Sequence, residues 1–342
     1  SALLANGVTL LGRSFKYHRP RGVFTAGPEE PSALVELGRD GRREPNLRAT
    51  TVELHDGLDA QSQHRWPSLR HDIGAINQRL SRFLPAGFYY KTFKWPSAFW
   101  ERVYEPIIRR SAGLGRAPDA ETHDADRYEQ IHAFCDVLVA GGGIAGLKAA
   151  REAADAGQRV ILVEQTAHCG GRAVVDGLEV EGQGAEAWVA AQLAALSSMP
   201  GVTVLSRTMV SGVYDHGYAL AYQRIADHTP GAEKPRHRLW RIRAGQIVSA
   251  TGAIERPLSF AGNDLPGVML ASAVRDYVVN WAVSPGKSVA VVTNNDDAYR
   301  TALALHAVGI KVPAVIDARR EATGDLPARV RAAGIRVIED AA

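Results

Sequence analysis

Residues 136–165 constrain the fold of this chain more than any other stretch, because they hold a glycine-rich turn between two apolar runs. Asp136 to Ala140 is short and apolar and predicts a buried parallel strand, which the pattern G-x-G-x-x-G follows at once. Residues 147–156 are rich in alanine and predict a helix that stops at Gly157. Residues 160–163 predict a second buried strand, so the stretch reads as a complete βαβ unit.

Each glycine of the pattern has its own physical task in a dinucleotide site. Gly141 makes the sharp turn, Gly143 lets the backbone approach a diphosphate, and Gly146 lets helix and strand pack closely. The phosphates would rest on the N-terminus of the helix. The pattern alone fits a structural glycine turn equally well, but the flanking strand and helix favour a nucleotide. The other turn residues assigned to the site are Gly142, Ile144 and Ala145.

Glu164 ends the second strand, 18 residues after Gly146. A carboxylate at this place can accept both hydroxyls of an adenosine ribose, and it favours a plain ribose over a 2′-phosphate. The alternative is a solvated glutamate at a strand end, which is common. Gln165 follows it and is assigned to the same site.

Three later segments are predicted to complete this site. Gly170, Gly171 and Arg172 present bare backbone and a guanidinium to a diphosphate, although a glycine turn with a surface arginine is the alternative. The neighbouring Cys169 has no C-x-x-C partner and is interpreted as a passive small residue. In the flavoprotein fold with two dinucleotide domains, the edge of a strand hydrogen-bonds the adenine, and Met209 and Val210 are assigned to that edge. An A-T-G turn of the same fold passes close to the dinucleotide, and here it is Ala250, Thr251 and Gly252.

A second βαβ half is predicted from a strand at 287–293 and a helix at 298–308, after an antiparallel excursion at 218–239 and a returning strand at 246–250. Its turn, residues 293–297, reads TNNDD and has no glycine. Side chains and two negative charges therefore stand where a phosphate would approach. The sequence predicts one dinucleotide in this chain and not two.

Composition limits the classes of function. The 342 residues suggest two or three domains, and 40 Lys+Arg against 37 Asp+Glu leave no basic field for nucleic acid. No apolar run is long enough to span a bilayer and no export signal is present, so we expect a cytoplasmic protein without a membrane segment. Two cysteines can form neither a disulfide framework nor a four-thiolate metal site. Because it has no initiator methionine and stops just after an expected strand at 335–338, the chain is expected to be part of a longer one.

The first 133 residues give weaker signals. We expect a helix at 1–7 capped by Gly7, strands at 33–37 and 50–54, and a linker at 109–127. An aromatic-rich region at 83–104 is interpreted as a docking layer, with flavin stacking as the alternative. A basic cluster is open to three interpretations, a solvated face, an anion site or a surface for an acidic partner, and it comprises Arg13, Lys16, His18, Arg19 and Arg21.

Long strings of this region carry a family resemblance. The strings are SFKYHRPRGVFTAGPEEPSALV, PNLRATTVELHDGLDAQSQHRWPSL and FLPAGFYYKTFKWP, and with the nucleotide half they closely resemble the alpha subunits of heterotetrameric sarcosine oxidases. The opening segment also resembles the ferredoxin-like module of amine and opine dehydrogenase subunits, in which HRPRGxF leads into a cysteine loop that holds a [2Fe–2S] cluster. Here that loop, Thr25 to Ala33, has no cysteine, so the module is expected to be structural and free of a cluster.

The resemblance implies a flavoprotein complex of sarcosine catabolism with beta, gamma and delta subunits. It implies oxidation of sarcosine to glycine, with formaldehyde or methylene-tetrahydrofolate and hydrogen peroxide, at an FAD in the beta subunit and an FMN at the alpha/beta interface. This chain would then hold an NAD that is not the hydride acceptor, and no catalytic residue or metal. A tetrahydrofolate-binding region would follow residue 342. Left open are an FAD-binding subunit of an amine, opine or proline dehydrogenase, and a scaffold with a vestigial nucleotide site.

The expected fold class is α/β, a Rossmann-like FAD/NAD(P)-binding fold with two dinucleotide domains behind a small α+β ferredoxin-like module. The expected domains are the ferredoxin-like module at 1–75, an aromatic-rich connecting region and linker at 76–133, and the dinucleotide-binding domain at 134–342.

Overall fold

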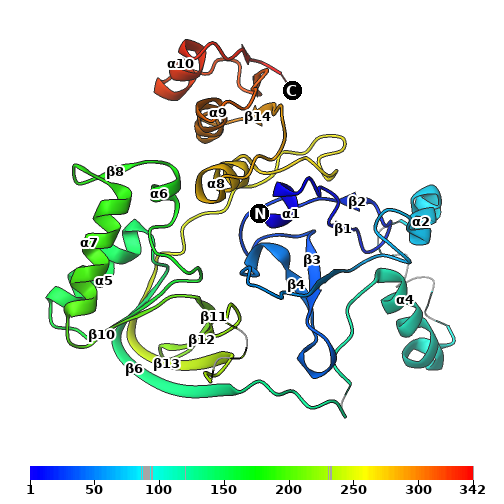
Figure 1. Cartoon of the computed structure of the whole chain (residues 1–342), viewed down its shortest axis with the longest axis horizontal. Coiled ribbons are helices and arrows are strands. Elements are labelled where there is room, and N and C mark those ends of the chain that lie inside the picture. The colour runs from blue at the N-terminus through cyan, green and yellow to red at the C-terminus, as the bar shows by residue number, and fades with distance from the viewer. Residues whose placement is uncertain are drawn as a thin grey trace. The chain divides into compact units, whose positions relative to one another are not determined.

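A computed structural model describes residues 1–85, 87, 93, 95–119, 121–229, 231 and 233–341. The chain forms two compact units (Figure 1), and the path of the backbone crosses between them more than once. The first unit comprises Ser1–Val52, Asp56–Asp124 and Glu255–Ala342, and the second comprises Glu53–His55 and Ala125–Ile254. The units do not follow the predicted domain boundaries, since residues after Ile254 group with the N-terminal residues.

The second unit is built on a mixed six-stranded sheet (Figure 1). Four strands are parallel, and an antiparallel ribbon extends the sheet on one side. In sheet order the strands are β10 (Val202–Leu205), β7 (Val160–Val163), β6 (Tyr128–Ala140), β13 (His237–Ser249), β12 (Tyr218–Arg224) and β11 (Thr208–Tyr214). The predicted strands at 160–163 and 202–205 and the predicted antiparallel excursion are confirmed.

Two helices cover one face of this sheet. Helix α5 (Ile144–Asp155) follows β6, and α7 (Ala185–Ser198) precedes β10. Their apolar side chains share one core with β6 and β7, which includes Leu147, Leu162 and Trp188. Side chains on the other face of the parallel strands share a second core with the antiparallel ribbon. Strand β12 contributes two small residues to this core, Ala219 and Ala221. Burial on both faces explains why β7 is apolar at every position. The short elements between α5 and α7 are α6 (Arg172–Val175), β8 (Glu179–Val180) and β9 (Gln183–Gly184).

The first unit begins with a small antiparallel module. Helix α1 (Ala2–Ala5) confirms the expected helix, and Gly7 ends it as predicted, because its φ is +71° and the N–H groups of Gly7 and Val8 donate to the carbonyl oxygens of Leu4 and Leu3 at 2.9 Å. Strand β3 confirms the strand predicted at 33–37, whereas the strand predicted at 50–54 is wrong, because residues 49–51 form a 3₁₀ turn. The strands are β1 (Gly12–Arg13) with β2 (Pro20–Arg21), and β4 (Glu44–Arg48), β3 (Leu34–Leu37) and β5 (Ala60–Ser62) in sheet order.

A helical segment follows in the same unit. Its elements are α2 (Ile76–Arg79), a π-helical turn at Trp100–Tyr104 and α4 (Glu105–Ala112), with 3₁₀ turns at Ile73–Ala75, Ser81–Phe83 and Ser97–Phe99. Two further 3₁₀ turns, Asp40–Arg42 and Ala49–Thr51, lie between the strands of the antiparallel module. The start of the predicted linker is therefore helical up to Ala112. Of the aromatic residues, Phe88, Tyr89 and Tyr90 lie outside the described residues, and the Tyr104 ring lies 5.1 Å from that of Phe93.

The last part of the first unit contains a three-stranded parallel sheet in the order β14 (Val291–Thr293), β15 (Val315–Asp317), β16 (Val337–Ile338). Its helices are α8 (Ala271–Trp281), α9 (Asp297–Ala307) and α10 (Asp325–Ala332). The second βαβ half predicted after residue 287 is confirmed by β14, α9 and β15, with a shorter first strand. No helix in the described part of the chain is both long and apolar enough to cross a membrane.

Candidate dinucleotide site

The turn between β6 and α5 accepts only glycine at two of its three patterned positions. Gly141 has φ +108°, and a Cβ there would lie 2.3 Å from the carbonyl oxygen of Ala250. A Cβ on Gly146 would lie 1.8 Å from the carbonyl oxygen of Gly141. The protein's own packing therefore requires both glycines, because no side chain fits against backbone at these distances.

Gly143 is different, because the protein's own packing does not require it. Its φ is −72°, which any residue adopts, and the nearest atom to an added Cβ would be the Gly171 Cα, 4.0 Å away. Gly143 caps the N-terminus of α5, where the first N–H groups have no acceptor within the helix. Open space, bare backbone and the positive end of a helix dipole thus meet at one point.

A second glycine turn lies against the first. The Gly170 N–H donates to the Gly142 carbonyl oxygen at 2.8 Å, and Gly143 and Gly170 form an isolated parallel bridge. Gly170 and Gly171 both have positive φ, +118° and +55°. The structure therefore brings together the two glycine segments that the sequence assigned to one diphosphate. Arg172 begins α6, and its guanidinium pairs at 3.0 Å with Asp176, the residue that caps the C-terminus of this helix.

Glu164 is a buried part of the protein and not a solvated strand end. Its side chain is turned towards the glycine turn, where Oε2 accepts the Gly142 N–H at 2.9 Å. Oε1 accepts the N–H and the hydroxyl of Thr166 at 2.8 and 2.9 Å. An ionised carboxylate has about four acceptor positions. The two N–H groups use two of them, and the Thr166 hydroxyl has a single proton for Oε1 or for the His168 carbonyl oxygen at 2.7 Å, so one or two positions are left for ribose hydroxyls.

The remaining predicted residues lie around this centre. Ala250 hydrogen-bonds Ala140 through its N–H at 2.8 Å, and the exposed Thr251 and Gly252 follow. Met209 and Val210 lie at the start of β11, next to Thr208, whose N–H donates to the Glu164 carbonyl oxygen at 2.7 Å. The last three residues assigned to the site are the exposed Gln165 and Ala145 and the half-buried Ile144.

Cys169 is next to the turn and chemically quiet. Its Sγ would lie 2.7 Å from a Cβ on Gly142. Burial, and next the charge of Glu164, raise the pKa of the Cys169 thiol to about 11. The group is thus a neutral thiol at neutral pH, which supports the interpretation as a passive residue.

The N-terminal basic cluster is an internal network, so the interpretation as a solvated face is wrong for its buried members. The Arg13 guanidinium donates to the carbonyl oxygens of Leu69 and His18, and the His18 ring contacts Asp72 at 2.6 Å. Arg19 forms a two-pronged pair with Asp264 at 2.8 Å, and Arg21 contacts the same carboxylate. The acidic partners Asp72 and Asp264 lie 54 and 245 residues away in sequence from His18 and Arg19, so these pairs were not visible in the local pattern.

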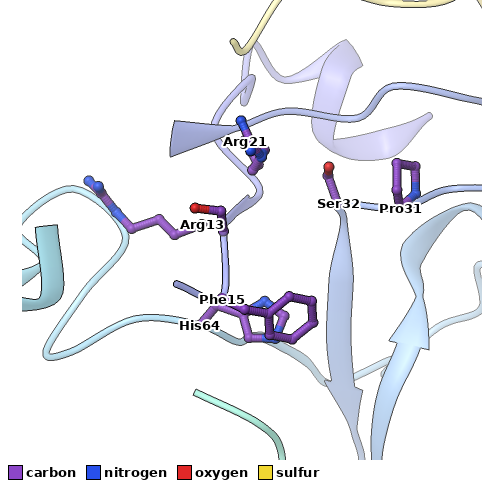
Figure 2. Close-up of a pocket in the computed structure, with 7 residues that line it drawn as sticks. Arg13, Phe15, Arg21, Pro31, Ser32 and His64 are labelled. Carbon is purple, nitrogen blue, oxygen red and sulfur yellow. The ribbon is translucent and has the colours of Figure 1, made fainter. Parts of the chain in front are cut away.

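A pocket of about 220 Å³ lies beside this network in the first unit (Figure 2), and sequence reasoning missed it. The Phe15 and His64 rings meet in it with centroids 4.3 Å apart. Burial, and next the charge of His18, lower the pKa of His64 to about 4, so its imidazole is neutral. Figure 2 shows the Arg13 side chain directed away from these rings, so the pocket does not present that charge to a ligand. The lining residues are Arg13, Ser14, Phe15, Arg21, Pro31, Ser32 and His64.

Acidic side chains occupy the helix N-terminus of the second βαβ half. Asp296 pairs with Arg319 at 2.8 Å, and Asp297 pairs with the buried Arg275 at 3.0 Å. These carboxylates are part of internal ion pairs at the start of α9. The arrangement agrees with the expectation that a phosphate does not bind here, which stays a prediction.

Two family models match the sequence. Residues 1–65 match the family described as "2Fe-2S iron-sulfur cluster binding domain", and residues 136–180 match "FAD dependent oxidoreductase". The chain is also similar to the crystal structure of L-proline dehydrogenase from P. horikoshii, with a TM-score of 0.58 and 22% identity over 95% of this chain and 51% of that one. These findings confirm the expected fold class.

Curated relatives extend the similarity to nearly all residues. The chain is 52% identical over 97% of its length to "Sarcosine oxidase subunit alpha" of Rhizobium meliloti, and covers 34% of that protein. It is 38% identical over 99% of its length to the protein of the same name from Corynebacterium sp. strain P-1, and covers 30% of it. Nearly the whole chain is therefore homologous to the sarcosine oxidase alpha subunits, of whose length it spans about a third.

Proposed function

We propose that this chain is the dinucleotide-binding part of the alpha subunit of a heterotetrameric sarcosine oxidase, an oxidoreductase acting on CH–NH donors. The whole complex would convert sarcosine to glycine, with formaldehyde or methylene-tetrahydrofolate and hydrogen peroxide. The amine would be oxidised on a partner subunit. The observation that carries the dinucleotide role is the open backbone at Gly143, which faces Gly171 at the N-terminus of α5.

The residues fit a dinucleotide with an unmodified adenosine ribose. The N–H groups at the start of α5 would hold the diphosphate, and Gly171 would let it approach from the other side. The free acceptor capacity of Glu164 would take one or both ribose hydroxyls. A 2′-phosphate would meet the negative charge of this carboxylate, so NAD and FAD fit better than NADP.

NAD is the proposed cofactor, and FAD is the second candidate. Similarity to sarcosine oxidase alpha subunits supports NAD, and the family description of residues 136–180 supports FAD. A bound nicotinamide supplies hydride chemistry, and in this proposal it stays bound and is not the acceptor of the main reaction. FAD would instead indicate an FAD-binding subunit of a related amine, opine or proline dehydrogenase.

The test is to denature the purified chain and identify the released nucleotide by mass. NAD in near-stoichiometric amount supports the proposal. FAD, which would also colour the protein yellow, supports the second candidate. If the protein contains neither nucleotide and binds neither when each is added, the result supports the remaining hypothesis, a scaffold with a vestigial nucleotide site.

Beta, gamma and delta subunits are the proposed partners, with FMN at the alpha/beta interface and a cytoplasmic location. Exposed aromatic side chains support a docking role for the helical segment of the first unit. Trp95 is 83% exposed and Phe83 is 75% exposed, although large apolar side chains are normally covered. Sarcosine and tetrahydrofolate would be handled by the complex as a whole.

A further inference from the structure

Glu30 is a buried acid whose carboxylate accepts hydrogen bonds from the backbone of the surrounding loop. The residue is only 1% exposed. One carboxylate oxygen accepts the N–H groups of Phe24 and Thr25 at 2.8 and 2.7 Å, and the Thr25 hydroxyl at 3.2 Å. The other accepts the N–H groups of Ser32 and Ala33 at 2.8 and 3.0 Å. A buried carboxylate is tolerated only when it is hydrogen-bonded as fully as this.

The position of Glu30 in the sequence matches that of a cluster ligand. Plant-type [2Fe–2S] loops have the spacing C-x₄-C-x₂-C with a more distant fourth cysteine. Thr25, Glu30 and Ala33 have this spacing, within the stretch that matches the iron-sulfur family. Thr50 fits the fourth place, since its hydroxyl donates to the Gly27 carbonyl oxygen at 2.7 Å and the adjacent Ala49 N–H donates to Ala33 at 2.8 Å.

The donors around Glu30 are those that an anionic cluster would use. Iron-sulfur clusters carry negative charge, and backbone N–H groups donate to their sulfur atoms. Four backbone N–H groups of this loop converge on the carboxylate instead. We propose that the Glu30 carboxylate has replaced a [2Fe–2S] cluster, and holds the vacated loop in its cluster-binding shape by hydrogen bonds.

The preserved loop shape is used for packing in the first unit. The Phe24 carbonyl oxygen accepts the Leu270 N–H at 2.9 Å, and the Thr25 carbonyl oxygen accepts the Tyr277 hydroxyl at 3.0 Å. Ala33 is fully buried in the core that α8 shares with this loop. Burial, and next the charge of Glu30, raise the pKa of Tyr277, so the hydroxyl remains a donor. Loss of the carboxylate should therefore loosen the contact between the loop and α8.

The first test compares Glu30→Gln with Glu29→Gln in the 342-residue chain. Both changes remove one negative charge, but the first also places an amide NH₂ against backbone donors. We expect Tm to fall by about 5 °C or more for Glu30→Gln and to stay nearly unchanged for the half-buried neighbour. Equal melting temperatures would contradict the proposal.

The second test restores the ligands. The variant Thr25→Cys/Glu30→Cys/Ala33→Cys/Thr50→Cys is incubated without oxygen with ferrous iron and sulfide, and then assayed for iron, acid-labile sulfide and the electron paramagnetic resonance signal of a reduced [2Fe–2S] cluster. The control carries the same four thiols with Glu29→Cys in place of Glu30→Cys. We expect a cluster only in the first variant. A cluster in the unmodified chain, or a folded first variant without iron, would overturn the replacement. If the first variant does not fold, the Glu30→Gln comparison decides.

Discussion

The Glu164 carboxylate accepts the backbone N–H of Gly142 at 2.9 Å and thereby ties the end of β7 to the turn that follows β6. The acid proposed to recognise the ribose is thus also one of the groups that shape the turn for the diphosphate. A variant at this position should affect both the affinity for the nucleotide and the order of the turn. Variants at Gly143 should affect the affinity alone.

Gly143→Val is expected to give a folded chain that retains little nucleotide. The position has ordinary φ and open space around a Cβ, so the protein tolerates the side chain, but the branched group fills the approach to the helix N-terminus. The measurement is nucleotide released per chain, with Tm recorded in parallel.

The matched control for this variant is Gly184→Val. Gly184 also precedes a helix, has φ −59° and has no atom within 4 Å of an added Cβ. It should keep its nucleotide. Full occupancy in Gly143→Val would show that the dinucleotide binds elsewhere.

Glu164→Ala is expected to weaken nucleotide binding by about 10- to 150-fold. This range corresponds to the loss of a charge-assisted hydrogen bond of about 1.5–3 kcal/mol. The Gly142 and Thr166 donors lose their acceptor as well, so Tm should also fall. Titration calorimetry with the released nucleotide measures the affinity, and the exposed Glu179→Ala is the control. An unchanged dissociation constant would remove Glu164 from the site.

Asp264 is expected to make the first unit sensitive to acid. Hydrogen bonding from Arg19, and next from Arg21, holds the pKa of Asp264 well below its usual 3.8. A carboxyl whose pKa is lower in the folded state stabilises the fold above the unfolded pKa, and this stability is lost as pH falls through the folded pKa. Asp264→Asn should therefore cost about 1–3 kcal/mol of unfolding free energy at pH 7.

The difference between the unmodified chain and Asp264→Asn should shrink progressively below about pH 4, because the carboxyl of the unfolded chain then binds a proton, and it should vanish only when the pH reaches the lower pKa of the folded state. Urea unfolding at a series of pH values measures it. Asp155→Asn removes an exposed pair with Arg151 and should change the free energy by less than about 0.5 kcal/mol. A difference that grows on acidification would mean that Asp264 does not titrate in this way.

The parts of the fold that were predictable are those decided by local pattern. Strands β7 and β10 begin and end at the predicted residues, because a short apolar run between polar turns has few other structures. Helix α5 begins at Ile144, three residues before the predicted start, since propensity does not reveal that the turn glycine is also its cap. The close contact of Gly146 with Gly141 follows from the spacing of the glycines alone.

Other features depend on partners far along the chain. Strand β6 begins at Tyr128 and not at Asp136, because its polar first half pairs with β13, more than 100 residues later. One interpretation of the basic cluster was a solvated face, yet four of its five side chains contact two distant acids. Asp72 contacts Arg13 and His18, and Asp264 contacts Arg19 and Arg21. The loop spacing places Glu30 at the position of a cluster ligand, but its role as the acceptor of four backbone N–H groups became visible only in the structure.

The division of the chain also bears on how it is made. Apart from Glu53–His55, the second unit consists of one continuous stretch, Ala125–Ile254. It can therefore fold while the rest of the chain is still being synthesised. The first unit has to wait, because the loop around Glu30 finds Leu270 and Tyr277 only after some 240 further residues have emerged. During that interval the N-terminal segment is incomplete and exposes apolar surface, and it is then that the nascent protein would most need a chaperone.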